Sequence, residues 1–403
     1  MSANLSVVSG SLQRSSGAHK PSKRVAIVHY WLVNMRGGER VLEALCELYP
    51  DADIFTHLYA ADRMSDIIRR HSVRTTFIAR LPWARRLYQS YLPLMPLALE
   101  QLDLRAYDLV ISSESGPAKG VLTRPDAVHV CYCHTPMRYA WNMYQEYRDG
   151  LSNPKRWAMA LLLHRIRQWD VTAAARVDHF VANSRNVAHR IRKYYRRDSI
   201  VIPPPVDIER FGTPPAVKAA DFYLCVGQLI PYKQVGIAVR AFNQLGKQLV
   251  VIGEGAQRAE LGQIAGPTIS FLERVDDETL RDYYARCRAL VFTADEDFGI
   301  VPLEAMAAGK PVIAYGSGGA LETIVPGRTG LFFSEQTAEA LADAVQHYES
   351  IEHVFDPIEI AAHARTFSKE RFKRAFHDFV ERVRSERQDG AEFDLSFEPA
   401  LLA

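Results

Sequence analysis

Short apolar runs of strand length alternate with longer segments whose apolar positions have a helical spacing. The first run covers 24–30, and a helical segment follows over 40–49. In the same half of the chain, further strands are predicted at 108–113, 127–134, 177–184 and 199–203, with a helix over 157–175. Alternating strands and helices are typical of a parallel sheet that helices cover on both faces. The pattern therefore predicts an α/β fold.

A second series of the same kind follows a proline-rich break at 203–205, which we interpret as an interdomain connection. Strands are predicted after it at 221–229, 248–253, 269–272, 289–293, 311–315 and 331–333. Their regular alternation with helices predicts a second Rossmann-like unit. The apolar spacing over 358–387 predicts a long amphipathic helix.

The predicted organisation has five parts, and 403 residues are enough for two domains with their own cores. They are a lead-in over 1–22, a first Rossmann-like domain over 23–203, a second over 204–357, a helix over 358–388 and a tail over 389–403. The lead-in is polar and lacks the apolar core of a signal peptide, so we expect it to be disordered. Ligands of such sheets bind beyond the carboxyl ends of the strands, which predicts a site in the cleft between the two domains.

Composition narrows the class of protein only slightly. Hydrophobic residues make up 48% and charged residues 24%, as in soluble globular proteins, and the net charge of +2 gives no indication of nucleic-acid binding. The five cysteines are scattered without the spacing of a metal site, so we expect reduced thiols in a cytosolic protein and no bound metal. No stretch approaches the roughly 18 to 20 apolar residues that span a bilayer, so we expect the chain to stay on the cytoplasmic side of any membrane it meets.

The most informative segment runs from Glu296 to Glu304. A Gly and a Pro lie between the two carboxylates, and Pro favours the first helical position, so we expect a helix to begin near Pro302. Glu296 then lies in the preceding loop and Glu304 in the first helical turn. Free backbone N–H groups near Gly299 and Ile300 suit a diphosphate. An acidic loop that caps a helix is the alternative interpretation.

This segment, with the Ala-Met-Ala that follows it, resembles the Glu-x7-Glu region of retaining GT-B glycosyltransferases of the large family-four group. The resemblance covers most of 24–385 and is most specific over 289–333. It implies two facing Rossmann-like domains and a C-terminal helix that crosses back onto the first. It further implies that Glu296 faces the hydroxyls of a donor sugar, that Glu304 accepts from the ribose hydroxyls, and that Phe298 borders the donor.

Relatives commonly place an Arg and a Lys after the first strand of the second domain, where both reach the donor diphosphate. Lys233 fits the second of these positions, but the first is Gln228, which has no charge. Stabilisation of the leaving group is then weaker, or another Arg supplies it, with Arg274 and Arg328 as candidates. Gly253 ends the next strand, where we expect the backbone to pass near the nucleotide. For Lys233, a surface position after a turn is the alternative.

On the first domain, His134 follows a strand, and the resemblance to bacterial relatives places it near the reacting sugar. A His either hydrogen-bonds a sugar hydroxyl or relays a proton near neutral pH. Arg138 is expected to line the acceptor pocket, and the pair Gly37 and Gly38 to contact donor phosphate or acceptor. Plain packing is the alternative for each. Glu322 lies either near the donor or at the positive end of a helix dipole.

Charge is concentrated in one region. Eleven Lys or Arg residues lie within 155–197, against Asp170 and Asp178 alone, and 81–88 mixes aromatic, aliphatic and basic groups. Such residues dock on anionic bilayers at about 1 kcal/mol per basic group, so we expect peripheral contact with the inner membrane. A solvated basic helix face is the alternative.

The preferred prediction is a retaining glycosyltransferase with His134, Glu296 and Lys233 as catalytic side chains. It would move a hexose to a lipid-linked or oligosaccharide acceptor of a bacterial surface polysaccharide, such as an O-antigen or exopolysaccharide. The segments around His134 and Lys233 look most like bacterial mannosyltransferases, which implies GDP-mannose as donor and no cofactor. A UDP-hexose donor and a non-catalytic sugar-nucleotide-binding scaffold are the alternatives. A dehydrogenase is disfavoured because no G-x-G-x-x-G follows the first strand.

Overall fold

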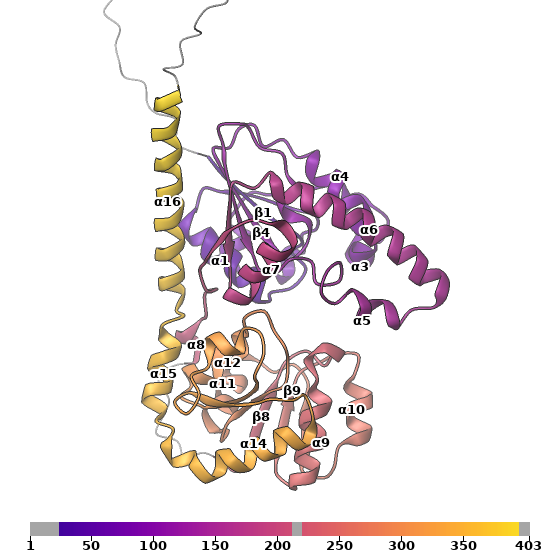
Figure 1. Ribbon diagram of the computed structural model, residues 1–403, viewed down its shortest axis with the longest axis vertical. Helices are drawn as coiled ribbons and strands as arrows, with labels where there is room; N and C mark the ends of the chain where they lie inside the picture. The colour runs from indigo at the N-terminus through magenta and orange to yellow at the C-terminus, as the bar shows by residue number, and fades with distance from the viewer. Residues whose placement is uncertain (1–23, 212–219, 395–403) are drawn as a thin grey trace, which may run out of the picture.

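A computed structural model describes residues 24–211 and 220–394 (Figure 1). The predicted lead-in over 1–22 lies outside the described residues, as does the predicted tail from 395 onward. The first six residues of that tail, 389–394, belong to the last helix instead. Within the described part the chain forms two α/β domains, each around one parallel sheet.

The first sheet has seven parallel strands in the order β3-β2-β1-β4-β5-β6-β7. The strands are β1 (Val25–His29), β2 (Asp53–Thr56), β3 (Val73–Thr75), β4 (Leu109–Glu114), β5 (Val128–Cys133), β6 (His179–Ala182) and β7 (Ser199–Val201). The sequence pattern did not predict β2 and β3. Both are short, and β3 is largely exposed at the sheet edge, so it carries no apolar run. The strand order reverses between β1 and β4, and a ligand site is expected beyond their carboxyl ends.

The helices of this domain cover both faces of its sheet (Figure 1). They are α1 (Gly37–Leu48), α2 (Asp66–Arg69), α3 (Ala84–Leu87), α4 (Met95–Glu100), α5 (Tyr144–Asp149), α6 (Asn153–Ala175) and α7 (Arg185–Tyr195), and α8 (Ile208–Phe211) leads to the second domain. Four short 3-10 turns lie among them, η1 (Ala61–Arg63), η2 (Phe77–Arg80), η3 (Tyr88–Leu94) and η4 (Pro117–Gly120).

The second sheet has six parallel strands in the order β10-β9-β8-β11-β12-β13, and each lies where a strand was predicted. They are β8 (Tyr223–Val226), β9 (Leu249–Ile252), β10 (Ile269–Leu272), β11 (Leu290–Phe292), β12 (Val312–Tyr315) and β13 (Gly330–Phe333). The intervening helices and 3-10 turns are η5 (Pro231–Lys233), α9 (Val235–Leu245), α10 (Arg258–Ile264), α11 (Asp277–Arg286), α12 (Ile300–Ala307), α13 (Ala320–Thr323), α14 (Ala338–Ile351) and η6 (Glu352–Val354). The order reverses between β8 and β11, as it does in the first sheet.

Helix α12 begins two residues earlier than predicted. Gly299 precedes it with φ of 86°, a conformation that glycine adopts without strain, and Ile300 is already helical. Pro302 therefore lies inside the first turn, where its missing N–H costs no intrahelical bond. Glu304 consequently lies beyond the free N–H groups of the helix start, in the second turn.

The helix predicted over 358–388 is two helices, α15 (Pro357–Arg365) and α16 (Lys369–Asp394). At the break between them, Phe367 O accepts from the backbone N of Val206 at 3.0 Å, which ties the end of the chain to the interdomain connection. Helix α16 then runs along the first domain, as the resemblance implied (Figure 1). Its apolar face joins the core of that domain through Phe372, Phe376, Phe379, Val380 and Val383.

Candidate active site between the two domains

The carboxyl ends of the two sheets are brought together by polar contacts that cross from one domain to the other. Arg190 of α7 forms an ion pair with Asp297, which lies between β11 and α12. Arg138, after β5, lies with Nη1 3.8 Å from Asp297 Oδ2 and donates from Nη2 to the Asp295 carbonyl oxygen at 3.5 Å. The loop before α12 therefore faces the loop after β5, as two facing domains require.

Glu322 of α13 caps a helix of the opposite domain. Its carboxylate accepts from the backbone N of Arg185 at 2.8 Å and of Asn186 at 2.9 Å, at the start of α7. These N–H groups have no partner within their own helix, and the positive end of the helix dipole favours the carboxylate. The second interpretation of Glu322 thus fits the structure, and the helix concerned is in the other domain.

Lys233 and Glu296, predicted from segments far apart in the sequence, form an ion pair. Thr293 Oγ1 donates to the Lys233 carbonyl oxygen at 2.8 Å, which fixes the turn after β8 against the end of β11. Burial and the nearby Arg138 guanidinium lower the pKa of Lys233 to about 8, whereas the Asp297 carboxylate raises it. A phosphate group that binds here would therefore meet the Lys233 ammonium, whose position Glu296 already fixes.

Glu304 is half-buried, and Tyr284 donates its hydroxyl to Oε2 at 3.0 Å. Burial raises the pKa of Glu304, although the Tyr284 bond and Arg210 oppose this effect. Ile300, at the start of the same helix, lies against the first domain, because a Cβ added to Gly37 would be 2.9 Å from its Cδ1.

The side chain of Phe298 lies in the core of the second domain, with its ring 5.8 Å from that of Phe367. Only its backbone is therefore available to a ligand. Gly253 also has a structural reason for being glycine, because a Cβ there would overlap the carbonyl oxygen of Gly227. The two loops after β8 and β9 pack backbone to backbone, which sets the position of Gln228.

His134 is partly buried and ends a chain of polar groups that begins in α1, whose other members, Glu39, His29 and Ser113, are buried. Ser113 Oγ, at the end of β4, lies 2.9 Å from His134 Nε2 and 3.1 Å from His29 Nδ1. His29 Nε2 lies 3.6 Å from Glu39 Oε1. A Cβ on Gly38 would be 3.7 Å from His134 Nε2, so the predicted glycine pair and the predicted His do meet.

Burial, and then the neighbouring His29, lower the pKa of His134 to about 3. The imidazole is therefore neutral at physiological pH. Of the two roles considered for His134, a hydrogen bond to a hydroxyl agrees with this pKa, whereas a proton relay that titrates near neutral pH does not.

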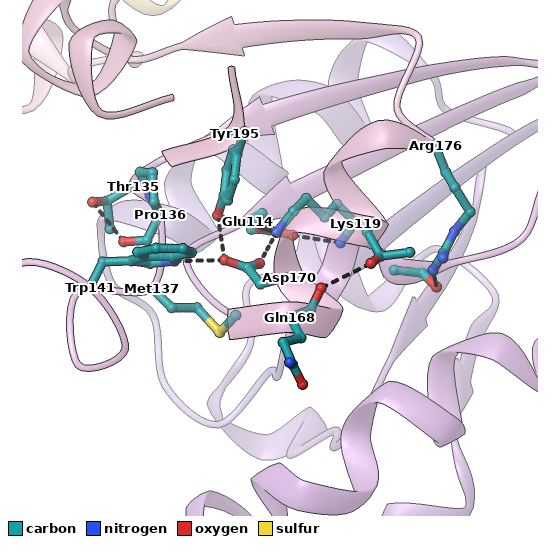
Figure 2. A network of polar contacts seen from close by, with 12 residues as sticks. Glu114, Lys119, Thr135, Pro136, Met137, Trp141, Gln168, Asp170, Arg176 and Tyr195 are labelled. Atoms are coloured by element: carbon teal, nitrogen blue, oxygen red, sulfur yellow. Dashed lines mark hydrogen bonds and ion pairs between the residues drawn. The ribbon is translucent and has the colours of Figure 1, made fainter. Parts of the chain in front are cut away.

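The loop that carries His134 rests on buried charges (Figure 2). Lys119 Nζ contacts Glu114 Oε1 at 2.5 Å and also the Asp170 carboxylate, and all three side chains are fully buried. Trp141 donates from Nε1 to Asp170 Oδ2 at 2.8 Å, while the Glu114 carbonyl oxygen accepts from the backbone N of His134 at 2.7 Å. Burial and the Asp170 charge raise the pKa of Glu114 to about 7, although Lys119 opposes the rise. The network thus holds both ends of the loop.

Sequence reasoning missed the supporting residues of this first-domain loop. Polar residues fill the second half of β4, from Ser112 to Glu114, and this was a usable signal for polar groups at the sheet edge. Lys119 and Asp170 gave no signal, because their partners come from distant segments. The candidate cations Arg274 and Arg328 do not belong to the contacts described above. Arg328 is 68% exposed and lies 3.5 Å from Glu359, and Arg274 is exposed after β10.

Within 24–211 and 220–394, no helix has both the length and the apolar character needed to cross a membrane. In the same ranges, no cluster of His, Cys, Asp and Glu has the arrangement of a metal site. All five cysteines are buried and unpaired.

Comparison with known proteins places the chain among sugar-transferring enzymes. The sequence model of Glycosyltransferase Family 4 matches residues 35–210, and that of Glycosyl transferases group 1 matches 207–363. A GDP-mannose-dependent alpha-(1-6)-phosphatidylinositol monomannoside mannosyltransferase of Mycobacterium tuberculosis is 33% identical over 172 residues, which cover 36% of this chain and 45% of the relative. The alpha-1,3/1,6-mannosyltransferase ALG2 of Saccharomyces cerevisiae is 29% identical over 279 residues, 56% of this chain and 53% of the relative.

The chain thus spans about half the length of the curated relatives that it matches. Among solved structures, HepE of Anabaena in complex with UDP and glucose has a TM-score of 0.63 at 16% identity, covering 88% of this chain and 99% of that one. This likeness confirms the predicted fold. Together the two sequence models span 35–363 without a gap, and the chain belongs to the GT-B glycosyltransferases of family 4.

Proposed function

We propose that the protein is a retaining glycosyltransferase that transfers mannose, or a related hexose, from GDP-mannose. The observation that carries this proposal is the meeting of Lys233 and Glu296 beside the start of α12, opposite His134 and the Gly37–Gly38 turn. Relatives whose names specify GDP-mannose support the choice of donor. A UDP-hexose is the alternative donor.

On the donor side, the Lys233 ammonium balances charge that grows on the leaving nucleoside diphosphate, together with the N–H groups of Gly299 and Ile300. Glu296 accepts hydrogen bonds from the sugar hydroxyls. Tyr284 holds Oε2 of Glu304, so we assign Oε1 to the ribose hydroxyls. Gln228 and the backbone at Gly253 border the same side.

On the acceptor side, neutral His134 bonds a sugar hydroxyl, and the Gly37–Gly38 turn contacts phosphate or acceptor. The bond between the sugar C1 and the diphosphate oxygen breaks while the acceptor oxygen bonds C1 on the same face. The acceptor proton passes to the leaving diphosphate, so the reaction requires no protein nucleophile and, in this proposal, no metal.

Calorimetry with GDP-mannose, UDP-glucose, GDP and UDP tests the donor, with Glu304→Ala as the variant that loses the ribose contact. Guanine-selective binding that the variant loses supports the proposal. Uridine-selective binding would change the proposed donor to a UDP-hexose and leave the proposed reaction as it is. Binding without transfer to any mannosyl or lipid-linked acceptor favours the scaffold alternative. NMR of the product then tests retention through the one-bond C1–H1 coupling of the transferred sugar, because the H1–H2 coupling is small in both anomers of mannose.

We propose further that the acceptor is a lipid-linked glycan of a bacterial surface polysaccharide, reached by peripheral contact with an anionic membrane. Trp83 on the turn before α3 and Trp157 on α6 are 77% and 79% exposed, and Leu161 follows Trp157 by one turn at 64%. Arg85 and Arg86 are exposed beside Trp83. Figure 1 places α3, α5 and α6 on the side of the first domain away from α16.

The basic run over 155–197 contributes less to such a surface than its charge suggested. Arg167 donates to the Ala140 carbonyl oxygen, Arg176 pairs with Glu100, and Arg190 pairs with Asp297. Flotation with anionic vesicles tests the membrane proposal. Trp157→Ser with Leu161→Ser should reduce binding, while Ile358→Ser, at a site that is 72% exposed on α15 of the second domain, should not. Equal vesicle binding by the wild type, the double variant and Ile358→Ser would refute the proposed membrane-binding surface.

A further inference from the structure

The donor half of the site has one cation fewer than the family resemblance requires. Gln228 stands where relatives carry an Arg, it is exposed, and it cannot balance phosphate charge. Two positive charges suit a leaving diphosphate, because negative charge grows on it as the glycosidic bond breaks. The contacts of this structure show which side chain can supply the second charge.

Arg138 and Lys233 meet at one aromatic ring, although they belong to different domains. The Arg138 Cζ lies 5.4 Å from the centroid of the Tyr232 ring, and the Lys233 Nζ lies 5.3 Å from the same centroid. After burial, the like charge of Arg138 is the main cause that lowers the Lys233 pKa. The two cations therefore form a pair around Tyr232.

The guanidinium of Arg138 has unused hydrogen-bonding capacity. It is 17% exposed, its contact to Asp297 is 3.8 Å and its contact to the Asp295 carbonyl oxygen is 3.5 Å, both longer than a good charge-assisted bond. Its Nε is buried without a hydrogen-bond partner. A planar guanidinium with free donors matches two phosphate oxygens, which accept in a bidentate manner.

The loop that bears Arg138 is held firmly enough to aim it. The Ala140 carbonyl oxygen, two residues on, accepts from Arg167 Nη1 at 2.9 Å, and Trp141 is anchored to Asp170 at 2.8 Å. A side chain positioned by such a loop loses little further freedom when a ligand arrives, which favours binding.

We propose that Arg138 is the second diphosphate-binding cation of this enzyme and replaces, from the first domain, the Arg that position 228 lacks. This assignment rests on the proposed function and deepens it. Because Arg138 and Lys233 come from different domains, a diphosphate between them binds the closed arrangement more tightly than an open one. Donor binding and domain closure are then coupled, with the coupling located in this one side chain.

Four full-length proteins test the assignment by calorimetry: the wild type, Arg138→Met, Gln228→Arg, and Arg138→Met with Gln228→Arg. The ligands are GDP and guanosine, or UDP and uridine if the wild type prefers uracil. Loss of a charge-assisted hydrogen bond should weaken diphosphate binding about tenfold to a hundredfold in Arg138→Met and leave nucleoside binding unchanged. Gln228→Arg should recover most of that loss in the double variant, because it returns a cation to the place that relatives use.

Arg328→Met is the matched control, because it removes an exposed cation of the second domain that pairs with Glu359 and does not lie at Tyr232. It should change the dissociation constant for GDP by less than threefold. A GDP affinity of Arg138→Met within twofold of the wild type would overturn the assignment, and so would an equal loss of GDP and guanosine affinity that Gln228→Arg does not recover. A wild type that binds neither GDP nor UDP would refute the proposed function itself, and this assignment with it.

Discussion

The two sides of the site are held in place by different kinds of contact. In the first domain, the loop with His134 and Arg138 is held by buried side chains, with Lys119 and Asp170 at their centre. In the second domain, the loop from Glu296 to α12 is held by close backbone packing, because a Cβ on Gly319 would overlap the Phe298 backbone. Buried ions tolerate the loss of a partner poorly, whereas close packing tolerates the gain of an atom poorly. The two domains should therefore fail under opposite changes.

The largest effect is expected from Lys119→Met, which removes the one cation between two buried carboxylates. Leaving Glu114 and Asp170 without a counter-ion should lower the free energy of unfolding by about 3 to 5 kcal/mol. Denaturant unfolding measures this, with Lys155→Met, at an exposed position of α6, as the control. A loss below about 1 kcal/mol would mean that the ions do not hold this side of the site.

The second effect concerns the glycine side. Gly319→Ala should cost about 1 to 3 kcal/mol through overpacking and should weaken nucleotide binding, because Phe298 lies two residues before the start of α12. Gly150→Ala is the control, since a Cβ there meets no atom within 4 Å. If both variants bind nucleotide like the wild type, backbone packing does not position this loop.

The third prediction distinguishes a role of His134 in sugar transfer from a role in stability alone. Ser113→Ala leaves the facing nitrogens of His29 and His134 without a partner, so we expect a loss of about 1 to 3 kcal/mol and a tenfold or larger fall in transfer rate. Ser112→Ala is closely matched, because Ser112 Oγ lies 2.9 Å from His129 Nε2 on the other face of β4. It should cost similar stability and preserve transfer. Equal falls in rate would contradict a specific role for Ser113.

The fourth effect is a gradual one, the acid sensitivity of the first domain. Burial lowers the pKa of His57 and His134 to about 3 and that of His129 to about 4. The unfolded chain then binds more protons below about pH 6.5, so the stability that these groups provide is complete above that pH and is lost as pH falls toward the folded values. Each should contribute a decrease of about 1.4 kcal/mol per pH unit in that window. Glu114, whose pKa burial raises to about 7, is protonated in the folded state first and should offset one histidine between about pH 7 and its unfolded pKa.

Unfolding between pH 7 and 5 measures this slope, followed by fluorescence of Trp141 and Trp169 in the first domain. His57→Phe should reduce the slope by one proton. A free energy of unfolding that stays constant over this range would show that the histidines are not buried as neutral groups.

The difference between the two sides of the site also explains which of their residues could be predicted from the sequence. Lys233, Glu296 and Glu304 were predicted because the family resemblance rests on short, local segments, and the six strands of the second sheet have continuous apolar runs. The chain from Glu39 through His29 and Ser113 to His134 could not be predicted, because it joins three segments that only the strand order β1-β4-β5 brings together. Polar groups at the ends of apolar strands were visible, but their partners were not.

Helix α16 has a consequence for the order in which the protein acquires its structure. The first domain leaves the ribosome early, yet Phe372, Phe376 and Phe379, which complete its core, are made only after the whole second domain. At about 5 to 20 residues per second, the wait is on the order of 10 seconds or more. During that time the surface of α1 that α16 will cover is exposed to solvent. The nascent first domain is thus a natural client for chaperones until the last helix emerges and docks.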